Sequence, residues 1–251
     1  MQYTLKKSLG QHFLKNELTC KAIVQAVLEH KPTHIVEVGP GGGAITKYFL
    51  LLKNIPFKAI EIDNEKVAYL TQKYPALKGN ILAESILTTA MPYEQPFAVV
   101  GNFPYNISTE ILFKLLTWRS HITSITGMFQ KEVALRIAAP KGSKVYGVTS
   151  VLLQAYFSIT YLFDVPPQDF TPPPKVMSGV IQLIPLTQVV PMSSPAKFTT
   201  LVKAAFNQRR KTLRNATKSL FAPEQLAHPT FELRAEQLSV ADFAALTFLM
   251  H

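Results

Sequence analysis

The chain has 251 residues, 47% of them hydrophobic, which is enough for one substantial core and a small second one. Its formal net charge of +10 suggests a polyanionic partner, with nucleic acid as the leading candidate. The single cysteine, Cys20, excludes an internal disulfide, no apolar run reaches the length of a membrane span, and the scattered histidines predict no metal site. This composition is typical of a cytoplasmic protein.

Strands and helices alternate through most of the chain. Residues 1–15 predict an irregular basic arm, and residues 17–29 predict a helix that ends before Pro32. Strands are expected at 34–39, 57–63, 97–102, 124–129, 158–165 and 180–185, with a short one at 77–81. Helices are expected at 44–53, 65–73, 108–116, 132–137 and 148–156. This alternation predicts an α/β fold with a mostly parallel, doubly wound sheet that binds ligands at the carboxyl ends of its strands.

The pattern changes after residue 185. Residues 186–195 carry Pro191 and Pro195 and are typical of a linker, and residues 196–251 have a helical pattern. We therefore expect two domains, residues 1–185 and a small α-helical domain of residues 186–251.

A glycine-rich turn follows the first predicted strand and opens a helix. The glycines of residues 39–43 allow a ligand to approach the main chain closely. Glu61, at the end of the second strand, can accept hydrogen bonds from two ribose hydroxyls. The spacing Gly39-x-Gly41-x-x-Ala44 also fits a dinucleotide fingerprint, so NAD and S-adenosylmethionine both remain possible ligands, as does a turn that binds nothing.

The segment Gly101-Asn102-Phe103-Pro104-Tyr105-Asn106 follows a buried apolar strand. The Asn102 amide oxygen and a carbonyl in the proline turn can each accept a hydrogen bond from one exocyclic amine, and Tyr105 can stack on the base that carries it. An adenine N6 is a poor nucleophile, so two acceptors that orient its lone pair toward an electrophile favour alkylation. The alternative is an ordinary turn.

This segment decides between the two cofactors. It suits an alkyl donor and has no obvious use in hydride transfer, and the sequence offers no catalytic histidine or Tyr-x-x-x-Lys motif for a dehydrogenase. The sequence therefore favours S-adenosylmethionine, and binding of NAD(H) in its place would reveal the dehydrogenase alternative.

Along essentially its whole length the chain resembles the ribosomal RNA small-subunit adenine dimethyltransferase family. The matching segments are SLGQHFL (8–14), GPGGG (39–43), GNFPYNIS (101–108), QKEVA (130–134), residues 146–154, FTPPPKVxS (170–178) and FNQRRKTLRN (206–215). The resemblance implies a Rossmann-like class I methyltransferase fold with a small helical C-terminal domain. It also implies a role in ribosome biogenesis, the dimethylation of N6 in two adjacent adenosines of the 3′-terminal hairpin of small-subunit rRNA.

The resemblance implies which residues bind the cofactor: Gln11, His12, Leu14, Gly39, Gly41, Glu61, Asn80 and Asn102. Asn80 stands where the family usually has an aspartate that faces the adenine amine of the cofactor, so this chain would lack a charge there. Asn102, Pro104 and Tyr105 would hold the target adenine. Phe170 would stack on the other face of that base, unless it is a core aromatic residue.

The RNA-binding residues are expected in the basic stretch 196–220, which contains no acidic residue. The candidates are Arg209, Arg210, Lys211, Arg214 and Lys218. Arg210 and Arg214 are four apart, which predicts that they share one helix face. The missing acidic residues favour contacts with phosphates over a solvated charge run.

The expected partner is small-subunit rRNA within a pre-ribosomal small subunit, bound by a monomer without a membrane. One alternative within the same fold is a macrolide-resistance methyltransferase that modifies large-subunit rRNA; segments 146–154 and 206–215 count against it. Another alternative is a non-catalytic assembly or transcription factor, and the intact Asn102, Pro104 and Tyr105 count against that.

Overall fold

The computed structural model describes residues 12–251, which pack as two units. The described part of the first unit is residues 12–134 and Ile159–Pro185, and the second unit is Leu135–Ser158 with Leu186–His251. This division differs from the expected one at 1–185 and 186–251, because Leu135–Ser158 packs with the C-terminal residues. A helical pattern reveals that a segment has an apolar face, but it does not reveal which core that face joins.

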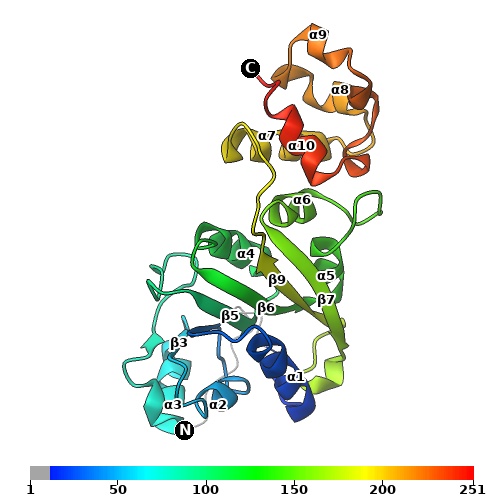
Figure 1. Ribbon diagram of the computed structural model, residues 1–251. Helices are drawn as coiled ribbons and strands as arrows, with labels where there is room; N and C mark the ends of the chain where they lie inside the picture. The colour runs from blue at the N-terminus through cyan, green and yellow to red at the C-terminus, as the bar shows by residue number, and fades with distance from the viewer. Residues whose placement is uncertain (1–11) are drawn as a thin grey trace. The chain divides into compact units, whose positions relative to one another are not determined.

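The first unit is built on a seven-stranded sheet with the strand order β4-β3-β2-β5-β6-β9-β7 (Figure 1). The strands are β2 (Ile35–Val38), β3 (Phe57–Ile60), β4 (Ile81–Leu82), β5 (Phe97–Asn102), β6 (Ile122–Gln130), β7 (Phe157–Val165) and β9 (Ser178–Pro185). Strands β4, β3, β2, β5 and β6 run parallel, and β9 pairs antiparallel with β6. The predicted α/β fold with a mostly parallel sheet is confirmed.

The strand order reverses between β2 and β5. The chain runs outward from β2 through β3 to β4 and then returns to place β5 on the other side of β2. Val38 pairs with Ile60, and Glu37 pairs with Val100, so the carboxyl ends of the three strands lie side by side. Open α/β sheets bind ligands at such a reversal.

The helices of the first unit flank this sheet (Figure 1). They are α1 (Glu17–Leu28), α2 (Thr46–Phe49), α3 (Asn64–Lys73), α4 (Ser108–Thr117) and the first part of α5 (Lys131–Ile137). Helix α2 is shorter than the expected 44–53, because the N–H groups of Leu51 and Leu52 bond three residues back and tighten the last turn. Among residues 12–251, no helix combines the length and apolar character needed to cross a membrane.

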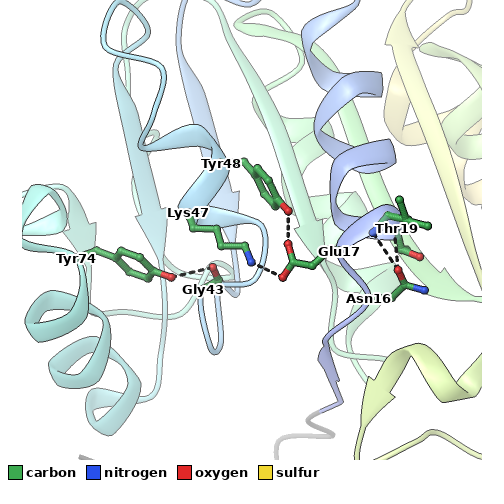
Figure 2. Close-up of polar contacts among 8 residues, drawn as sticks. Asn16, Glu17, Thr19, Gly43, Lys47, Tyr48 and Tyr74 are labelled. Carbon is green, nitrogen blue, oxygen red and sulfur yellow. Dashed lines mark hydrogen bonds and ion pairs between the residues drawn. The ribbon is translucent and has the colours of Figure 1, made fainter.

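Helix α1 is tied to α2, which follows the glycine-rich turn. The carboxylate of Glu17 accepts hydrogen bonds from Lys47 and Tyr48 (Figure 2). The bond from Lys47 lowers the pKa of Glu17. On the other side of the turn, the Tyr74 hydroxyl donates to the Gly43 carbonyl across 3.5 Å. The turn is therefore held from both sides.

The first described residues of the N-terminal arm pair with the start of the proline-rich segment. Strand β1 (Phe13–Leu14) runs antiparallel to β8 (Phe170–Thr171) in a separate two-stranded sheet. Asp169 anchors the residues that follow β1: its carboxylate accepts bonds from the Asn16 amide across 2.9 Å and from the Thr19 hydroxyl across 2.6 Å. Asn16 itself caps α1.

The second unit is helical, as the sequence predicts for its C-terminal part. Its helices are α6 (Val148–Gln154), α7 (Pro195–Asn207), α8 (Leu213–Thr217), α9 (Pro223–Leu226) and α10 (Val240–Leu246). Its core is aromatic: the Phe206 ring lies 6.0 Å from the ring of Tyr146 and 5.9 Å from that of Phe243. Tyr146 comes from the inserted segment, so that segment is part of this core.

Candidate functional site

A cavity of about 330 Å³ opens in the first unit at the carboxyl ends of β2, β3 and β5. Three segments supply much of its lining, namely His12–Leu14, the residues from Glu37 to Gly42 and the residues from Asn102 to Ile107. Of the predicted site residues, the structure brings these to the cavity: His12, Leu14, Gly39, Gly41, Glu61, Asn102, Pro104 and Tyr105. Gln11 lies outside the described residues.

The glycine-rich turn needs glycine at two positions that the cavity uses. Gly39 has φ +69° and Gly41 has φ +56°, a region that favours glycine. A Cβ atom on Gly41 would also lie 2.9 Å from the Phe13 ring. Because Gly41 has no side chain, the turn and the N-terminal arm can approach each other closely.

Glu61 is buried, and both carboxylate oxygens accept main-chain hydrogen bonds. One oxygen accepts from the Gly41 N–H across 3.2 Å, and the other accepts from the Asp63 N–H across 3.0 Å. The carboxylate thus joins the glycine-rich turn to the start of α3. Each oxygen retains acceptor capacity for a ligand hydroxyl.

Glu37, the last acidic residue before the turn, also lines the cavity and is 2% exposed. Burial raises its pKa to about 8, and the nearby charge of Glu61 acts in the same direction. The Thr46 hydroxyl donates a bond to its carboxyl group across 2.7 Å, which acts in the opposite direction. Burial thus favours the protonated form of Glu37.

Asn102 ends strand β5 and reaches the N-terminal arm. Its amide nitrogen donates a hydrogen bond to the His12 carbonyl across 2.8 Å. Because that carbonyl can only accept, the contact determines which end of the amide faces the arm. The amide oxygen is left for another partner.

The packing of the Phe103 side chain holds the turn after Asn102 in place. The Phe103 ring is buried and packs edge-on against Phe129 at 5.2 Å. A Cβ atom on Gly127 of the neighbouring strand would lie 2.7 Å from this ring, so glycine there makes room for the phenylalanine. The Pro104 carbonyl accepts a bond from the Ile107 N–H across 3.2 Å and keeps a second lone pair.

Tyr105 is half-buried at the cavity wall and held at two points. Its hydroxyl lies 2.6 Å from the hydroxyl of Ser178, and the His12 ring stacks on it with centroids 5.6 Å apart. Burial raises the pKa of Tyr105, and the bond to Ser178 acts in the opposite direction.

Two predicted site residues do not line the cavity. Asn80 is exposed, and its amide donates to the Ala76 carbonyl across 3.1 Å. Phe170 is 1% exposed and belongs to the core cluster that includes Leu14, so its position fits the alternative of a core aromatic residue.

Several residues that line the cavity, among them Glu84 and Lys66, have no role in the sequence interpretation. Glu84 and Ser85 follow β4 and line the cavity, unlike Asn80, which precedes that strand. The sequence signal that could have identified Glu84 is its position just past a short strand, the same position that Glu61 has after β3. Lys66 is buried in the wall, with its ammonium 3.7 Å from Asp63 and 5.0 Å from the Phe13 ring centroid.

The basic stretch of the second unit is not one helix. Helix α7 ends at Asn207, a turn carries Arg209 to Lys211, and α8 begins at Leu213. The prediction that Arg210 and Arg214 share a helix face is therefore wrong. Gln208 leaves the helical conformation, with φ −119° and ψ 53°, and this separates the two helices.

Acidic residues from later in the chain balance part of the basic stretch. Arg214 pairs with Glu232 across 2.5 Å, and Arg209 lies 3.8 Å from Glu236. The other three candidates, Arg210, Lys211 and Lys218, are exposed and have no ion-pair partner within residues 12–251. Three of the five candidates are therefore uncompensated cations.

A family model described as ribosomal RNA adenine dimethylase matches residues 2–249. The ribosomal RNA small subunit methyltransferase A of Cytophaga hutchinsonii is 47% identical over 249 residues, which cover 98% of this chain and 96% of that protein. The protein of the same name from Flavobacterium johnsoniae is 48% identical over 246 residues and covers 96% and 94% of the two chains.

Two solved structures share the architecture over nearly the whole chain. A dimethyladenosine transferase from Plasmodium falciparum has a TM-score of 0.74 at 24% identity and covers 92% of this chain and 94% of its own. The 23S rRNA methyltransferase ErmE has a TM-score of 0.70 at 22% identity and covers 93% and 99%. At such identities the likeness shows the fold, which is that of a Rossmann-like methyltransferase. The family model and the two sequence relatives show that this chain belongs to the ribosomal RNA adenine dimethylase family.

Proposed function

We propose that the protein uses S-adenosylmethionine to dimethylate N6 of two adjacent adenosines in the 3′-terminal hairpin of small-subunit rRNA. Its family makes it an rRNA adenine dimethyltransferase. One observation carries the proposal: Asn102, Pro104 and Tyr105 line the same cavity as the glycine-rich turn and Glu61. This arrangement would bring a gripped base amine and a bound methyl donor together.

The cavity residues fit S-adenosylmethionine, which supplies an electrophilic methyl group when bound. The open main chain at Gly39 and Gly41 would accept its methionine and ribose parts, beside His12 and Leu14 of the arm. Glu61, buried and already fixed by two N–H groups, would accept bonds from the ribose hydroxyls. Glu84 stands past the end of β4 and replaces Asn80 as our candidate acceptor for the cofactor's adenine amine.

The target amine would be gripped by two acceptors. The Asn102 amide oxygen and the Pro104 carbonyl would each accept one N6 hydrogen, while the Tyr105 ring stacks on the extruded base. Holding both hydrogens favours a more tetrahedral nitrogen and directs its lone pair toward the methyl carbon. Bound S-adenosylmethionine would supply the methyl group to this nitrogen, and the donor's methyl–sulfur bond would break as the N–C bond formed. The alkylated nitrogen is acidic and releases its proton, so no charged base is required.

The RNA would be held by charge outside the cavity. Arg210, Lys211 and Lys218 are the candidates that are exposed and lack an ion-pair partner within residues 12–251, and they would contact phosphates. Arg209 and Arg214 are paired with carboxylates and would contribute less. Specificity would come from the shape of the RNA and from bases exposed in a loop. The proposed setting is a pre-ribosomal small subunit in the cytoplasm, bound by a monomer.

The experiment is methylation of undermethylated small subunits with a labelled donor, followed by mapping of the modified bases. We expect label on N6 of two adjacent adenosines near the 3′ end of the small-subunit rRNA. Large subunits and their rRNA serve as the parallel substrate. Label that appears only on the large-subunit rRNA, or no label on either RNA, would overturn the proposal.

A further inference from the structure

Ser178 ends the proline-rich motif of residues 170–178, and the chemistry proposed above gives it no role. It is the first residue of β9, where it pairs with Gln130, and it is 0% exposed. Its hydroxyl is within 2.6 Å of the Tyr105 hydroxyl. Because the buried Ser178 hydroxyl bonds to Tyr105, which lines the cavity, it connects the sheet directly to the cavity wall.

The same motif reaches Tyr105 a second time, through His12. The Pro172 carbonyl lies 2.9 Å from the His12 Nδ1 atom, and the His12 ring stacks on Tyr105 with an interplanar angle of 29°. The motif therefore holds the tyrosine at two places, directly through Ser178 at its hydroxyl and indirectly through His12 at one face of its ring.

We infer that Ser178 is a positioning residue that fixes where the Tyr105 ring lies for stacking on the target adenine. The inference rests on the proposed function. Rotation about the first side-chain torsion of tyrosine swings the whole ring between staggered positions. The hydroxyl lies on the axis of the second torsion, so a hydrogen bond there holds the far end of the ring in place before RNA binds, while the stacked His12 ring restricts its plane. The base then meets a surface that needs no further ordering.

The two hydroxyls act as one unit, so a double-mutant cycle tests the inference. Ser178→Ala and Tyr105→Phe each remove one end of the same bond and keep the ring. Each is expected to lower kcat/KM for undermethylated small subunits by about threefold to tenfold, the range of one intramolecular hydrogen bond. The double variant is expected to lose no more than the larger single loss. Losses that multiply in the double variant would overturn the inference.

A second readout reports stacking of the base on the positioned ring. Small subunits are reconstituted with rRNA that carries 2-aminopurine at a target adenosine, and the fluorescence quenching on protein binding is measured. Ser178→Ala is expected to reduce the quenching while S-adenosylmethionine affinity and melting temperature stay at wild-type values. Unchanged quenching, or a loss that tracks a fall in melting temperature, would show that Ser178 only supports the fold.

A matched control lies in the same sheet. Ser124 of β6 is also 0% exposed, but its hydroxyl has no hydrogen-bond partner among residues 12–251. Ser124→Ala should leave both readouts unchanged, and a loss equal to that of Ser178→Ala would overturn the inference. Failure of the proposed function is distinguishable, because the wild-type protein would then not methylate the small subunits at all.

Discussion

The Asn102 side-chain amide donates a hydrogen bond to the His12 main-chain carbonyl across 2.8 Å, so the end of β5 and the N-terminal arm are directly joined. The contact has two consequences. It turns the amide oxygen away from the arm, and it makes the geometry of Asn102 depend on an arm that also lines the cofactor cavity.

The first prediction concerns Asn102→Ala, which removes both the oxygen proposed to orient N6 and the link to the arm. The chemical step should slow by about 10²–10³-fold, as for loss of one transition-state hydrogen-bonding group. Asn102→Asp keeps an acceptor but sets a carboxylate oxygen against the His12 carbonyl. It should fall between wild type and Ala. Single-turnover rates at saturating RNA and donor test this, and an Ala variant with near-normal rates would mean that Asn102 is only a turn residue.

The second prediction concerns Glu61→Ala. The change removes the proposed ribose acceptor and the main-chain bonds from Gly41 of the glycine-rich turn and from Asp63 at the start of α3, so donor binding should weaken by about 1.5–3 kcal/mol. Titration calorimetry with S-adenosylmethionine measures the effect. Glu94→Ala removes an exposed carboxylate away from the cavity and should bind as wild type does. Equal affinity in all three proteins would contradict the assignment.

The third prediction separates Glu84 from Asn80. Glu84→Ala should weaken S-adenosylmethionine binding by about 1–3 kcal/mol if its carboxylate accepts a bond from the adenine amine. Asn80→Ala should change it little, because the Asn80 amide is directed to the Ala76 carbonyl. Calorimetry of the two variants side by side measures their S-adenosylmethionine affinities. A larger loss in Asn80→Ala than in Glu84→Ala would assign the adenine amine to Asn80.

The fourth prediction concerns the exposed cations of the second unit. Arg210→Ala combined with Lys211→Ala should weaken RNA binding and flatten its salt dependence by up to about 0.9 log units per lost phosphate contact. Donor affinity and melting temperature should not change. Lys203→Ala, an exposed cation on α7, is the matched control. A double variant that keeps the wild-type salt slope would remove these residues from the RNA surface.

The fifth prediction is a pH dependence caused by Glu37. Its pKa is about 8 in the folded protein against an ordinary 4.5, so between these values the folded state holds a proton that the unfolded state has released. The free energy of unfolding should therefore decrease as pH rises from about 4.5 to 8. Glu37→Gln, which stays neutral and still accepts from Thr46, should gain stability relative to wild type over that interval. Denaturation at pH 5 and pH 8 tests it, and a constant difference would refute it.

Local signals predicted the sheet and the turn at its edge. The buried strands around Val38 and Val100 appear as apolar runs, and the glycine-rich turn between a strand and a helix is a local pattern, so both were readable from sequence. Asn102 and Glu61 follow strand ends. Because parallel strands present their carboxyl ends at one edge, strand order alone brings these side chains to one cavity.

Contacts between distant segments could not be predicted from the sequence. Phe170 is in the core because β8 pairs with β1, and no pattern near residue 170 reports that pairing. The family resemblance places Asn80 at the cofactor, but β4 begins at Ile81, so the residues beyond its carboxyl end line the cavity instead. Likewise, Glu232 neutralises Arg214 from a separate turn, which a count of charges within one stretch omits.

The second unit is assembled from two stretches of chain, and this limits how it can be made. The inserted stretch supplies Tyr146 to the aromatic core, and its Ser143 carbonyl accepts a bond from Arg209. A fragment that begins at residue 186 would lack both partners and should not fold by itself. During synthesis, residues 135–158 are made before their partners in α7 and α10. Their apolar face therefore stays uncovered until α10 has been made.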